Sequence, residues 1–228
     1  EEGKRTWHLT DAFPKVEPTK ESSGLKQRTV FNPGIVLQML CRKLTLTSAR
    51  FFYTQGEACE CAVGINPHSP RWSKLYRRLN KFGNNKWIAL DFSAFDLTCT
   101  TDIFDKAFNV IINVCIRSGY SMKEIAMLKV LKRVLRDNTI NLNGDLIQLP
   151  GIIISGINLT SLLGSIVNSL LLRSAFYDIF ENKPGMLKEG FRSHVSLATF
   201  GDDSTAQVSN TAFKFNTDNI ICVFAKWN

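Results

Sequence analysis

Apolar residues recur at intervals of three and four positions in several segments of the chain, and this spacing predicts helices. One of these segments begins after Thr100 and Thr101, either of which can serve as an N-cap, with Asp102 in the first turn. The predicted helices are Pro33–Leu44, Arg71–Leu79, Thr101–Ile116, Met122–Arg136 and Leu159–Phe176.

Short apolar or alternating runs predict strands between these helices. Asn143-Gly144 separates two such runs, which predicts a hairpin because a type I′ turn needs two residues that tolerate positive φ. A second hairpin is predicted around Gly201-Asp202-Asp203. Helices and hairpins follow one another irregularly, so we expect an α+β fold with a mainly antiparallel sheet. The predicted strands are Lys86–Leu90, the two halves of Thr139–Leu149, Val195–Phe200 and Ala206–Val208.

The composition is that of a globular protein, and its charge is unevenly distributed. The 228 residues are 44% hydrophobic and 21% charged, with a formal net charge of +8. Glu1–Lys86 contains 15 Lys and Arg against 7 Asp and Glu, whereas Trp87–Asn228 contains 13 of each. The excess of basic residues therefore lies in the first third, which indicates contact with a polyanion or, equally, a solvated basic surface.

A close pair of cysteines does not predict a zinc site, and a long apolar stretch does not predict a membrane span. Of the six cysteines only Cys59 and Cys61 are close, and without a second pair or a nearby histidine they make a poor zinc site, so free thiols are expected. No secretory signal opens the sequence. Leu146–Leu172 has too many polar residues for a lipid-facing helix: Gln148, Pro150, Ser155, Asn158, Thr160 and Asn168.

Three carboxylates stand where predicted apolar strands end, and a buried charge there is costly without a partner. Asp91 follows Ile88-Ala89-Leu90. Asp202 and Asp203 follow Ala198-Thr199-Phe200 at the tip of the second hairpin. If the two strands are neighbours, the three side chains meet at one edge of the sheet. Such a cluster stays ionised near neutral pH when cations neutralise it, and two Mg²⁺ or Mn²⁺ ions about 3.5–4 Å apart serve in-line displacement at phosphorus.

Gly-Asp-Asp alone is usually only a turn, so the residues that accompany Gly201-Asp202-Asp203 decide its interpretation. Asp91 and Asp96 frame a D-x4-D segment. Ser155-Gly156 and Thr160 form S-G-x3-T at a predicted loop-to-helix junction. In order and separation these segments resemble those of the RNA-dependent RNA polymerases of picornavirus-like positive-strand RNA viruses, which include picornaviruses, dicistroviruses and their marine relatives.

The resemblance extends from about Phe13 to Ser204. It implies a right-hand polymerase fold, with a fingers segment at residues 1–86 and a palm at residues 87–228 that contains a fingers insertion at about residues 113–153. The thumb is absent, so the chain is expected to be a fragment. Asp91–Asp96 resembles motif A, Ser155–Ser169 motif B, Phe200–Ser204 motif C, Lys15-Val16-Glu17 and Lys26–Val30 motif F, and Ala62-Val63-Gly64 with Asn66-Pro67 a template-contacting loop.

The resemblance also implies a role for each matching residue. Asp91 and Asp202 would be catalytic residues and the principal ligands of two Mg²⁺ ions (or Mn²⁺), with Asp203 a weaker ligand. Asp96 would accept a hydrogen bond from the ribose 2′-hydroxyl and so select ribonucleotides. Lys15 has two interpretations, a triphosphate-binding residue and an ordinary surface lysine. The other implied substrate-binding residues are Lys15, Lys26 and Arg28 for the triphosphate, Ser155 and Gly156 for template and ribose, Thr160 as a support for Asp96, and Asn168.

One position departs from this pattern. Relatives usually carry asparagine four residues after the motif B threonine, where it helps Asp96 recognise the 2′-hydroxyl, and this chain has Gly164 there. Asn168 lies one turn further along the predicted helix. We therefore expect weaker ribose selection than in those relatives unless Asn168 supplies the contact, and Gly164→Asn is expected to strengthen it.

The implied activity is template-directed RNA synthesis in viral genome replication, in which NMP passes from NTP to an RNA 3′-hydroxyl and pyrophosphate is released. A reverse transcriptase shares the palm but usually has an aromatic residue where Asp96 stands. A non-catalytic RNA-binding module would have no metal site. The implied partners are RNA template and primer, NTPs and other viral replication proteins, at a membrane-associated complex in the host cytoplasm. Without a thumb, such a fragment can fold and still be inactive.

Overall fold

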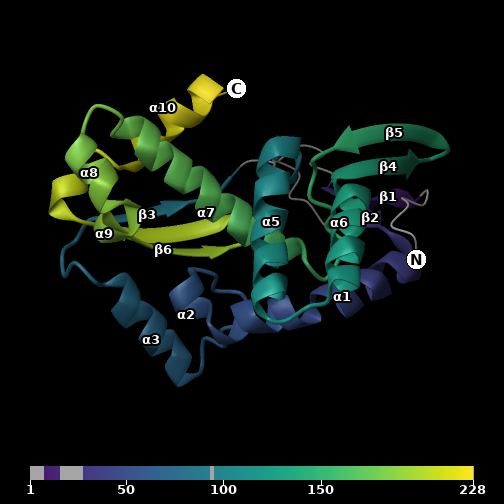
Figure 1. Ribbon diagram of the computed structural model, residues 1–228. Coiled ribbons are helices and arrows are strands. Elements are labelled where there is room, and N and C mark those ends of the chain that lie inside the picture. Colours follow the sequence, from purple (N-terminus) through teal and green to yellow (C-terminus); the bar gives the residue numbers. More distant parts are fainter. Residues whose placement is uncertain (1–7, 16–27, 93–94, 228) are drawn as a thin grey trace. The chain divides into compact units, whose positions relative to one another are not determined.

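The computed structural model describes residues 8–15, 28–92 and 95–227, which form two compact units (Figure 1). The first unit consists of Glu1–Ser48 and Asp96–Thr160, and the second of Ala49–Phe95 and Ser161–Asn228. The fold is mixed α+β, as the sequence predicts. The fingers and palm boundaries stay a prediction, because compactness alone does not identify either part.

A four-stranded sheet in the order β2-β1-β4-β5 organises the first unit. β1 runs antiparallel to β2 and parallel to β4, and β4 and β5 form the predicted hairpin. Asn143 has a φ of +55° and Gly144 one of +102°, as the turn requires. The strands are β1 (Leu9–Lys15), β2 (Arg28–Asn32), β4 (Asp137–Leu142) and β5 (Asp145–Pro150). Ala12, Phe31 and Ile140 of these strands form a core with Ile152 and Ile154 from the loop after β5.

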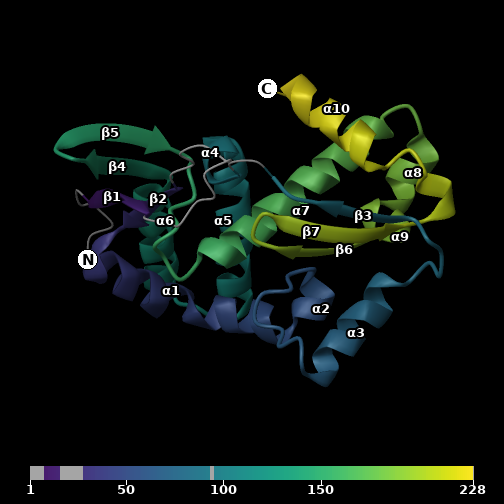
Figure 2. The ribbon, with the colours of Figure 1, turned by 180° about the vertical axis from the view of Figure 1, so that it is seen from behind.

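Two helices of the first unit, α5 (Thr101–Arg117) and α6 (Met122–Arg136), lie side by side (Figures 1 and 2). The Thr100 side chain caps α5 by accepting from the Ile103 N–H. A Ser121–Glu124 capping box starts α6. Both boundaries agree closely with the predicted ones. Two further helices, α1 (Gly34–Thr54) and α4 (Phe95–Thr98), each cross a boundary between the units.

An antiparallel three-stranded sheet in the order β3-β7-β6 organises the second unit. Helices α7 and α10 cover one face of this sheet, and α3 lies on the other (Figures 1 and 2). Leu197 and Ala206 pack on the α7 side, whereas Ala198 packs on the α3 side, because successive strand residues alternate between faces. The elements are α2 (Gly56–Cys59), α3 (Pro70–Leu79), β3 (Trp87–Leu90), α7 (Thr160–Ile179), α8 (Pro184–Glu189), α9 (Phe191–His194), β6 (Val195–Phe200), β7 (Asp203–Val208), a 3₁₀ turn (Asn210–Ala212) and α10 (Thr217–Trp227).

The predicted helices and strands are present, with differences at some ends. α1 continues ten residues beyond the predicted Leu44, to Thr54, and β7 begins at Asp203 rather than Ala206. β1 and α10 are absent from the predicted elements. β1 pairs with β2 and also with β4, whose residues are about 130 positions away, for example Asp11 with Asn141. A local pattern carries little information about such a partner.

The apolar stretch Leu146–Leu172 is divided among β5, an intervening loop and α7, so it does not form one helix. Across the part of the chain that the structure describes, no helix has both the length and the apolar character needed to cross a bilayer. All six cysteines carry free thiols.

Candidate active site

The sheet of the second unit places two acidic residues at the same end of neighbouring strands. β3 and β7 pair antiparallel, with Leu90 opposite Ser204. One further step in this register sets Asp91 opposite Asp203, the first residue of β7. Both side chains are exposed. The convergence predicted from the sequence therefore occurs for this pair through strand pairing.

Helix α7 holds the turn that carries the acidic residues of motif C. Gly201 adopts a left-handed φ of +62° in this turn, a conformation that favours glycine. The fully buried Asn168 side chain donates through Nδ2 to the carbonyl oxygens of Gly201 (3.2 Å), Asp202 (2.7 Å) and Asp203 (3.3 Å). One turn earlier, the Ser165 hydroxyl accepts from the Gly201 N–H at 2.8 Å. Four backbone groups of the turn are thus fixed by two side chains of α7.

Gly164 faces the same turn and lies close to it. A Cβ at Gly164 would lie 3.3 Å from the Gly201 Cα and 3.5 Å from the Phe95 ring. The absence of a side chain therefore allows α7 to approach the turn closely. The expectation that Gly164→Asn strengthens ribose selection stays a prediction, and an asparagine side chain there would lie in tight contact with the turn.

An open cavity of about 550 Å³ adjoins the two carboxylates on the α3 side of the sheet. Its walls come from α3, from the loop before α3 and from the ends of all three strands. Trp72 of α3 and Phe200 of β6 are the two aromatic side chains in the lining, and both are about half exposed. The lining residues are Ala62, Ile65, Pro67, Trp72, Leu75, Ala89, Leu90, Asp91, Ala198, Thr199, Phe200, Asp203, Ser204 and Thr205.

The residue types at this end of the sheet fit a divalent cation, because exposed carboxylates supply hard oxygen ligands. Asp91 and Asp203 line the cavity, whereas Asp202, in the turn before β7, does not. Among the described residues, no three His, Cys, Asp or Glu side chains lie close enough to one another to hold a metal ion. Burial raises the pKa of the Cys59 and Cys61 thiols, which disfavours a thiolate site nearby.

The motif B residues before α7 are tied to β2 within the first unit. The Ser155 hydroxyl accepts from the Phe31 N–H at 3.3 Å. A Cβ on Gly156 would overlap the Phe31 carbonyl oxygen, so only glycine fits there. The Thr160 hydroxyl donates to two nearby backbone carbonyls at 2.7 and 2.8 Å, and the backbone carbonyl of Asp96 accepts from the Ile153 N–H at 3.3 Å. The predicted support of Asp96 by Thr160 stays a prediction.

The basic residues of motif F are described only in part. Lys15, an exposed residue, ends β1, and its backbone pairs with that of Arg28 at the start of β2. Lys26 lies outside the described residues. Among the predicted site residues, Lys15, Arg28, Asp96, Ser155, Gly156 and Thr160 thus belong to the first unit, and Asp91, Asn168, Asp202 and Asp203 to the second.

Comparison with known protein families shows which family the chain belongs to. A family model described as "Viral RNA-dependent RNA polymerase" matches residues 2–227, nearly the whole chain. The chain belongs to the viral RNA-dependent RNA polymerase family. The resemblance predicted from the sequence motifs is confirmed. In viral RNA-dependent RNA polymerases, divalent metal ions are generally required, which agrees with the residue types found here.

The polymerase chain resembles proteins of several plant viruses. It is 30% identical over 174 residues to the RNA1 polyprotein of Broad bean wilt virus 2, covering 75% of this chain and 9% of that polyprotein. It is 28% identical over 214 residues to the RNA1 polyprotein of Grapevine fanleaf virus, covering 89% of this chain and 9% of that polyprotein. The chain therefore spans about a tenth of the length of these relatives.

Among solved structures, the Sicinivirus 3Dpol RNA dependent RNA polymerase has a similar fold. The TM-score is 0.72 at 18% sequence identity, and the match covers 90% of this chain and 42% of that chain. The likeness concerns the fold, and it extends over less than half of the Sicinivirus polymerase.

Glu60, a buried acidic residue of the polymerase, was not among the site residues predicted from the sequence. Its carboxylate accepts from Arg173 at 2.6 and 2.7 Å, from Arg192 at 2.9 Å and from Ser169 at 3.0 Å. Its backbone carbonyl accepts from the Thr199 N–H at 2.8 Å. Glu60 thus joins the loop that borders the cavity to α7, α9 and β6. Its left-handed φ of +64° is invisible in the sequence, and its partners are more than 100 positions away.

Replacing Asn168 by alanine in the complete polymerase is expected to lower kcat about 5- to 150-fold and to raise the Mg²⁺ concentration needed for half-maximal rate. The reason is that three backbone carbonyls lose their donor, and an unpaired buried polar group costs about 1–3 kcal/mol. Steady-state kinetics across a Mg²⁺ titration measure both effects. Asn182→Ala, at an exposed position on the α7–α8 connection, is the matched control, and an unchanged Mg²⁺ dependence for Asn168→Ala would exclude this positioning role.

Proposed function

We propose that this chain is the fingers and palm part of a right-hand RNA polymerase that adds NMP from NTP to an RNA 3′-hydroxyl and releases pyrophosphate. The observation that carries the proposal is the pair Asp91 and Asp203 beside one cavity in a member of the viral RNA-dependent RNA polymerase family. The backbone of Asp203 belongs to the turn that α7 holds. Because the chain spans only part of its relatives, the activity is proposed for the complete polymerase.

The carboxylates of Asp91, Asp202 and Asp203 would hold two Mg²⁺ ions, with Asp91 and Asp202 as the principal ligands. When bound, these ions activate the attacking 3′-hydroxyl and stabilise the leaving pyrophosphate. Asn168 and Ser165 keep the backbone of the acidic turn fixed, so that the carboxylates meet the substrate in one arrangement.

The substrate-binding residues of the first unit would orient the nucleotide. Lys15, Lys26 and Arg28 would bind the triphosphate, with Arg28 offering a bidentate contact. The Ser155-Gly156 loop would place template and ribose, and its attachment to β2 supports this role. Asp96 would accept the ribose 2′-hydroxyl. The buried Asn168 has its amide nitrogen committed to the turn, so the sugar contact falls chiefly to Asp96.

Primer extension by the complete polymerase tests the proposal. With a primed RNA template, Mg²⁺ and labelled nucleotides, we expect template-dependent incorporation of NTPs, and much less of dNTPs. Efficient incorporation of dNTPs would instead indicate a reverse transcriptase. RNA binding without incorporation of either nucleotide, under conditions in which a related viral polymerase is active, would indicate a non-catalytic RNA-binding module.

We also propose a setting for the polymerase, whose matched relatives are viral RNA1 polyproteins. The polymerase would act on RNA template and primer together with other viral replication proteins. Its place would be a membrane-associated replication complex in the host cytoplasm. Co-fractionation of the polymerase with newly made viral RNA on membranes of infected cells would support this location.

Asp96→Ala in the complete polymerase is expected to reduce the preference for NTP over dNTP by about 5- to 150-fold. The basis is a single acceptor for the 2′-hydroxyl, whose loss costs about 1–3 kcal/mol. The measurement is the ratio of kcat/KM for an NTP and its dNTP. Asp102→Ala, at an exposed position in the first turn of α5, is the control, and an unchanged ratio in Asp96→Ala would show that Asp96 does not sense the sugar.

A further inference from the structure

A loop that pairs with the outer edge of β6 forms one wall of the cavity beside the carboxylates. Thr199 of β6 donates its N–H to the Glu60 carbonyl oxygen, and its own carbonyl oxygen accepts from the Ala62 N–H, both at 2.8 Å. These two bonds make a short parallel bridge between the loop and the strand. Ala62 lines the cavity, as do Thr199 and the neighbouring Phe200. The width of the cavity at this wall therefore depends on where Glu60 is held.

Glu60 has a backbone conformation that favours glycine, and its side chain accounts for a charged residue at this position. Its φ of +64° lies in the left-handed region. The buried carboxylate binds the guanidinium groups of Arg173 and Arg192 and the Ser169 hydroxyl. A backbone conformation of this kind persists where the surrounding contacts over-determine it, and such positions gather at functional sites. The carboxylate therefore fixes the loop against α7, which carries Arg173 and Ser169.

Thr199 also connects this loop to the acidic turn. Its buried hydroxyl has two acceptors, the Glu60 carbonyl oxygen at 3.2 Å and the Ser165 carbonyl oxygen at 3.1 Å. The Ser165 hydroxyl in turn accepts from the N–H of Gly201, in the turn that carries Asp203, at 2.8 Å. Two buried residues thus link the backbone of Glu60 to that of the acidic turn, and a displacement of the loop reaches the turn through them.

We propose that Glu60 is a positioning residue for nucleotide addition. Its carboxylate fixes the loop that lines the cavity, and Thr199 and Ser165 transmit this position to the acidic turn. Glu60 touches neither the substrates nor the metal ions in this proposal, and it acts through the backbone of its neighbours. Buried polar networks whose members are paired hold the groups of a site in one arrangement. The inference rests on the proposed function, because the position of the turn matters for the rate only if its carboxylates hold the metal ions.

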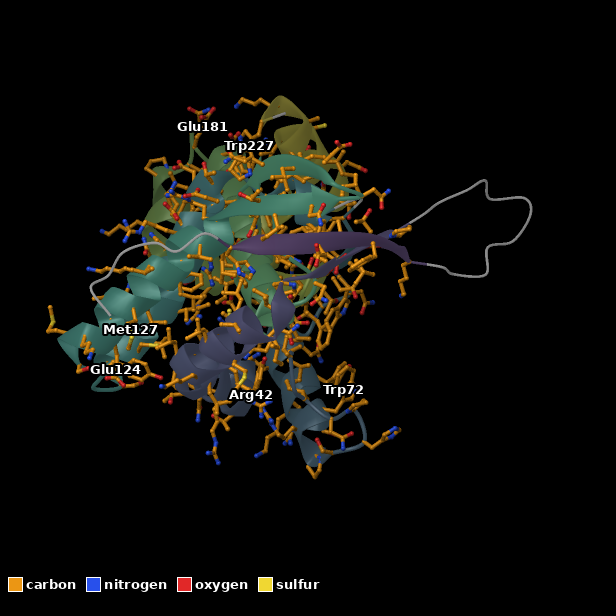
Figure 3. All side chains as sticks on the ribbon, turned by 90° about the vertical axis from the view of Figure 1, so that its right-hand side faces the viewer. Arg42, Trp72, Glu124, Met127, Glu181 and Trp227 are labelled. Carbon is orange, nitrogen blue, oxygen red and sulfur yellow. The ribbon has the colours of Figure 1, made fainter. Side chains whose placement is uncertain are left out.

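The test in the complete polymerase is Glu60→Gln, which keeps the shape of the side chain and removes its charge. The Gly201 amide exchanges with D₂O only when its bond to Ser165 opens, and it is expected to exchange about 2- to 30-fold faster than in the wild type. Below the melting temperature of each protein, kcat per active site is expected to fall, and the Mg²⁺ concentration for half-maximal rate to rise, by factors in the same range. Amides of α5 are the internal reference for exchange. Glu181→Gln, at an exposed position, is the control that leaves all three values unchanged (Figure 3).

A second variant, Thr199→Val, tests the connection between the loop and the turn. It keeps the shape of the side chain and removes the hydroxyl that lies between Glu60 and Ser165. Faster exchange of the Gly201 amide and a raised Mg²⁺ requirement are expected here too. Glu60→Gln is expected to add less in the Thr199→Val background than in the wild type, because the connection is already broken and residues of one network are not additive.

Two outcomes would overturn the inference. One is a lower Tm for Glu60→Gln with unchanged Gly201 exchange and unchanged Mg²⁺ dependence, which would make Glu60 a structural contact only. The other is full additivity of Glu60→Gln and Thr199→Val. The exchange measurement needs neither substrate nor metal ion, so it separates this inference from the proposed function. Full activity of Asp91→Ala would contradict the catalytic assignment, whereas the exchange rate of Gly201 decides whether Glu60 holds the turn.

Discussion

Replacing Asp91 or Asp202 by alanine is expected to slow nucleotide addition by the complete polymerase on the order of 10³-fold or more. Each change removes a proposed principal metal ligand, and bound metal ions contribute several kcal/mol of charge stabilisation in the transition state. Single-turnover incorporation of one NTP measures the effect on the chemical step. Asp203→Ala is expected to leave more residual activity, since Asp203 is the weaker ligand in the proposal.

Asp145→Ala, in the exposed hairpin between β4 and β5, is the matched control and should retain the wild-type rate. Near-normal rates for Asp91→Ala or Asp202→Ala would refute the catalytic assignment. The loss of activity in Asp202→Ala compared with that in Asp203→Ala is also informative. Asp203, and not Asp202, shares the cavity with Asp91, so a greater loss in Asp203→Ala would mean that strand register predicts the ligands better than the sequence resemblance does.

Replacing Glu60 by alanine is expected to lower the free energy of unfolding by about 3 kcal/mol, which corresponds to a fall in Tm of about 6–12 °C for a domain of this size. The Glu60 carboxylate is buried, and its removal leaves Arg173, whose side chain is only 25% exposed, without its ion-pair partner. The guanidinium of Arg173 also lies 4.5 Å from the centre of the Phe191 ring, so its displacement disturbs the hydrophobic core. Thermal denaturation of the polymerase measures the change.

Glu181→Ala is the control for this prediction, because Glu181 is exposed after α7 and makes no comparable ion pair among those described (Figure 3). Its Tm should stay within about 1–2 °C of the wild-type value. Glu60→Gln keeps hydrogen-bond acceptors and should lose less stability than Glu60→Ala. If Glu60→Ala melted at the wild-type temperature, the ion cluster would contribute nothing net to the fold.

Elements with strong local determinants could be predicted from the sequence. The boundaries of α5 and α6 follow from caps at Thr100 and Ser121, and the β4–β5 hairpin follows from Asn143-Gly144. The acidic residues at strand ends could also be predicted, because a charge after an apolar run is rarely structural. Each of these features depends on residues within a few positions of one another.

The features that could not be predicted depend on contacts between distant segments. The amide nitrogen of Asn168 holds the acidic turn 33 to 35 positions away, a contact that the helix pattern did not indicate, and its role at the substrate stays a prediction. Gly164 was expected only to lack a contact, but it allows α7 to approach Gly201. Glu60 and Trp72 have neighbours that only the folded sheet brings close. The spacing of apolar residues predicts which face of α7 is buried. It does not predict which turn packs against that face.

The most direct test of the central claim, that Asp91, Asp202 and Asp203 hold the metal ions of nucleotidyl transfer, is crystallographic. Crystals of the complete polymerase with primed RNA and a non-hydrolysable NTP would be soaked with Mn²⁺, and anomalous scattering would locate the ions. We predict Mn²⁺ peaks within bonding distance of the Asp91 and Asp202 carboxylates, with Asp203 turned toward the same ions. Saturating Mn²⁺ that binds the NTP but leaves these carboxylates without a peak would contradict the account.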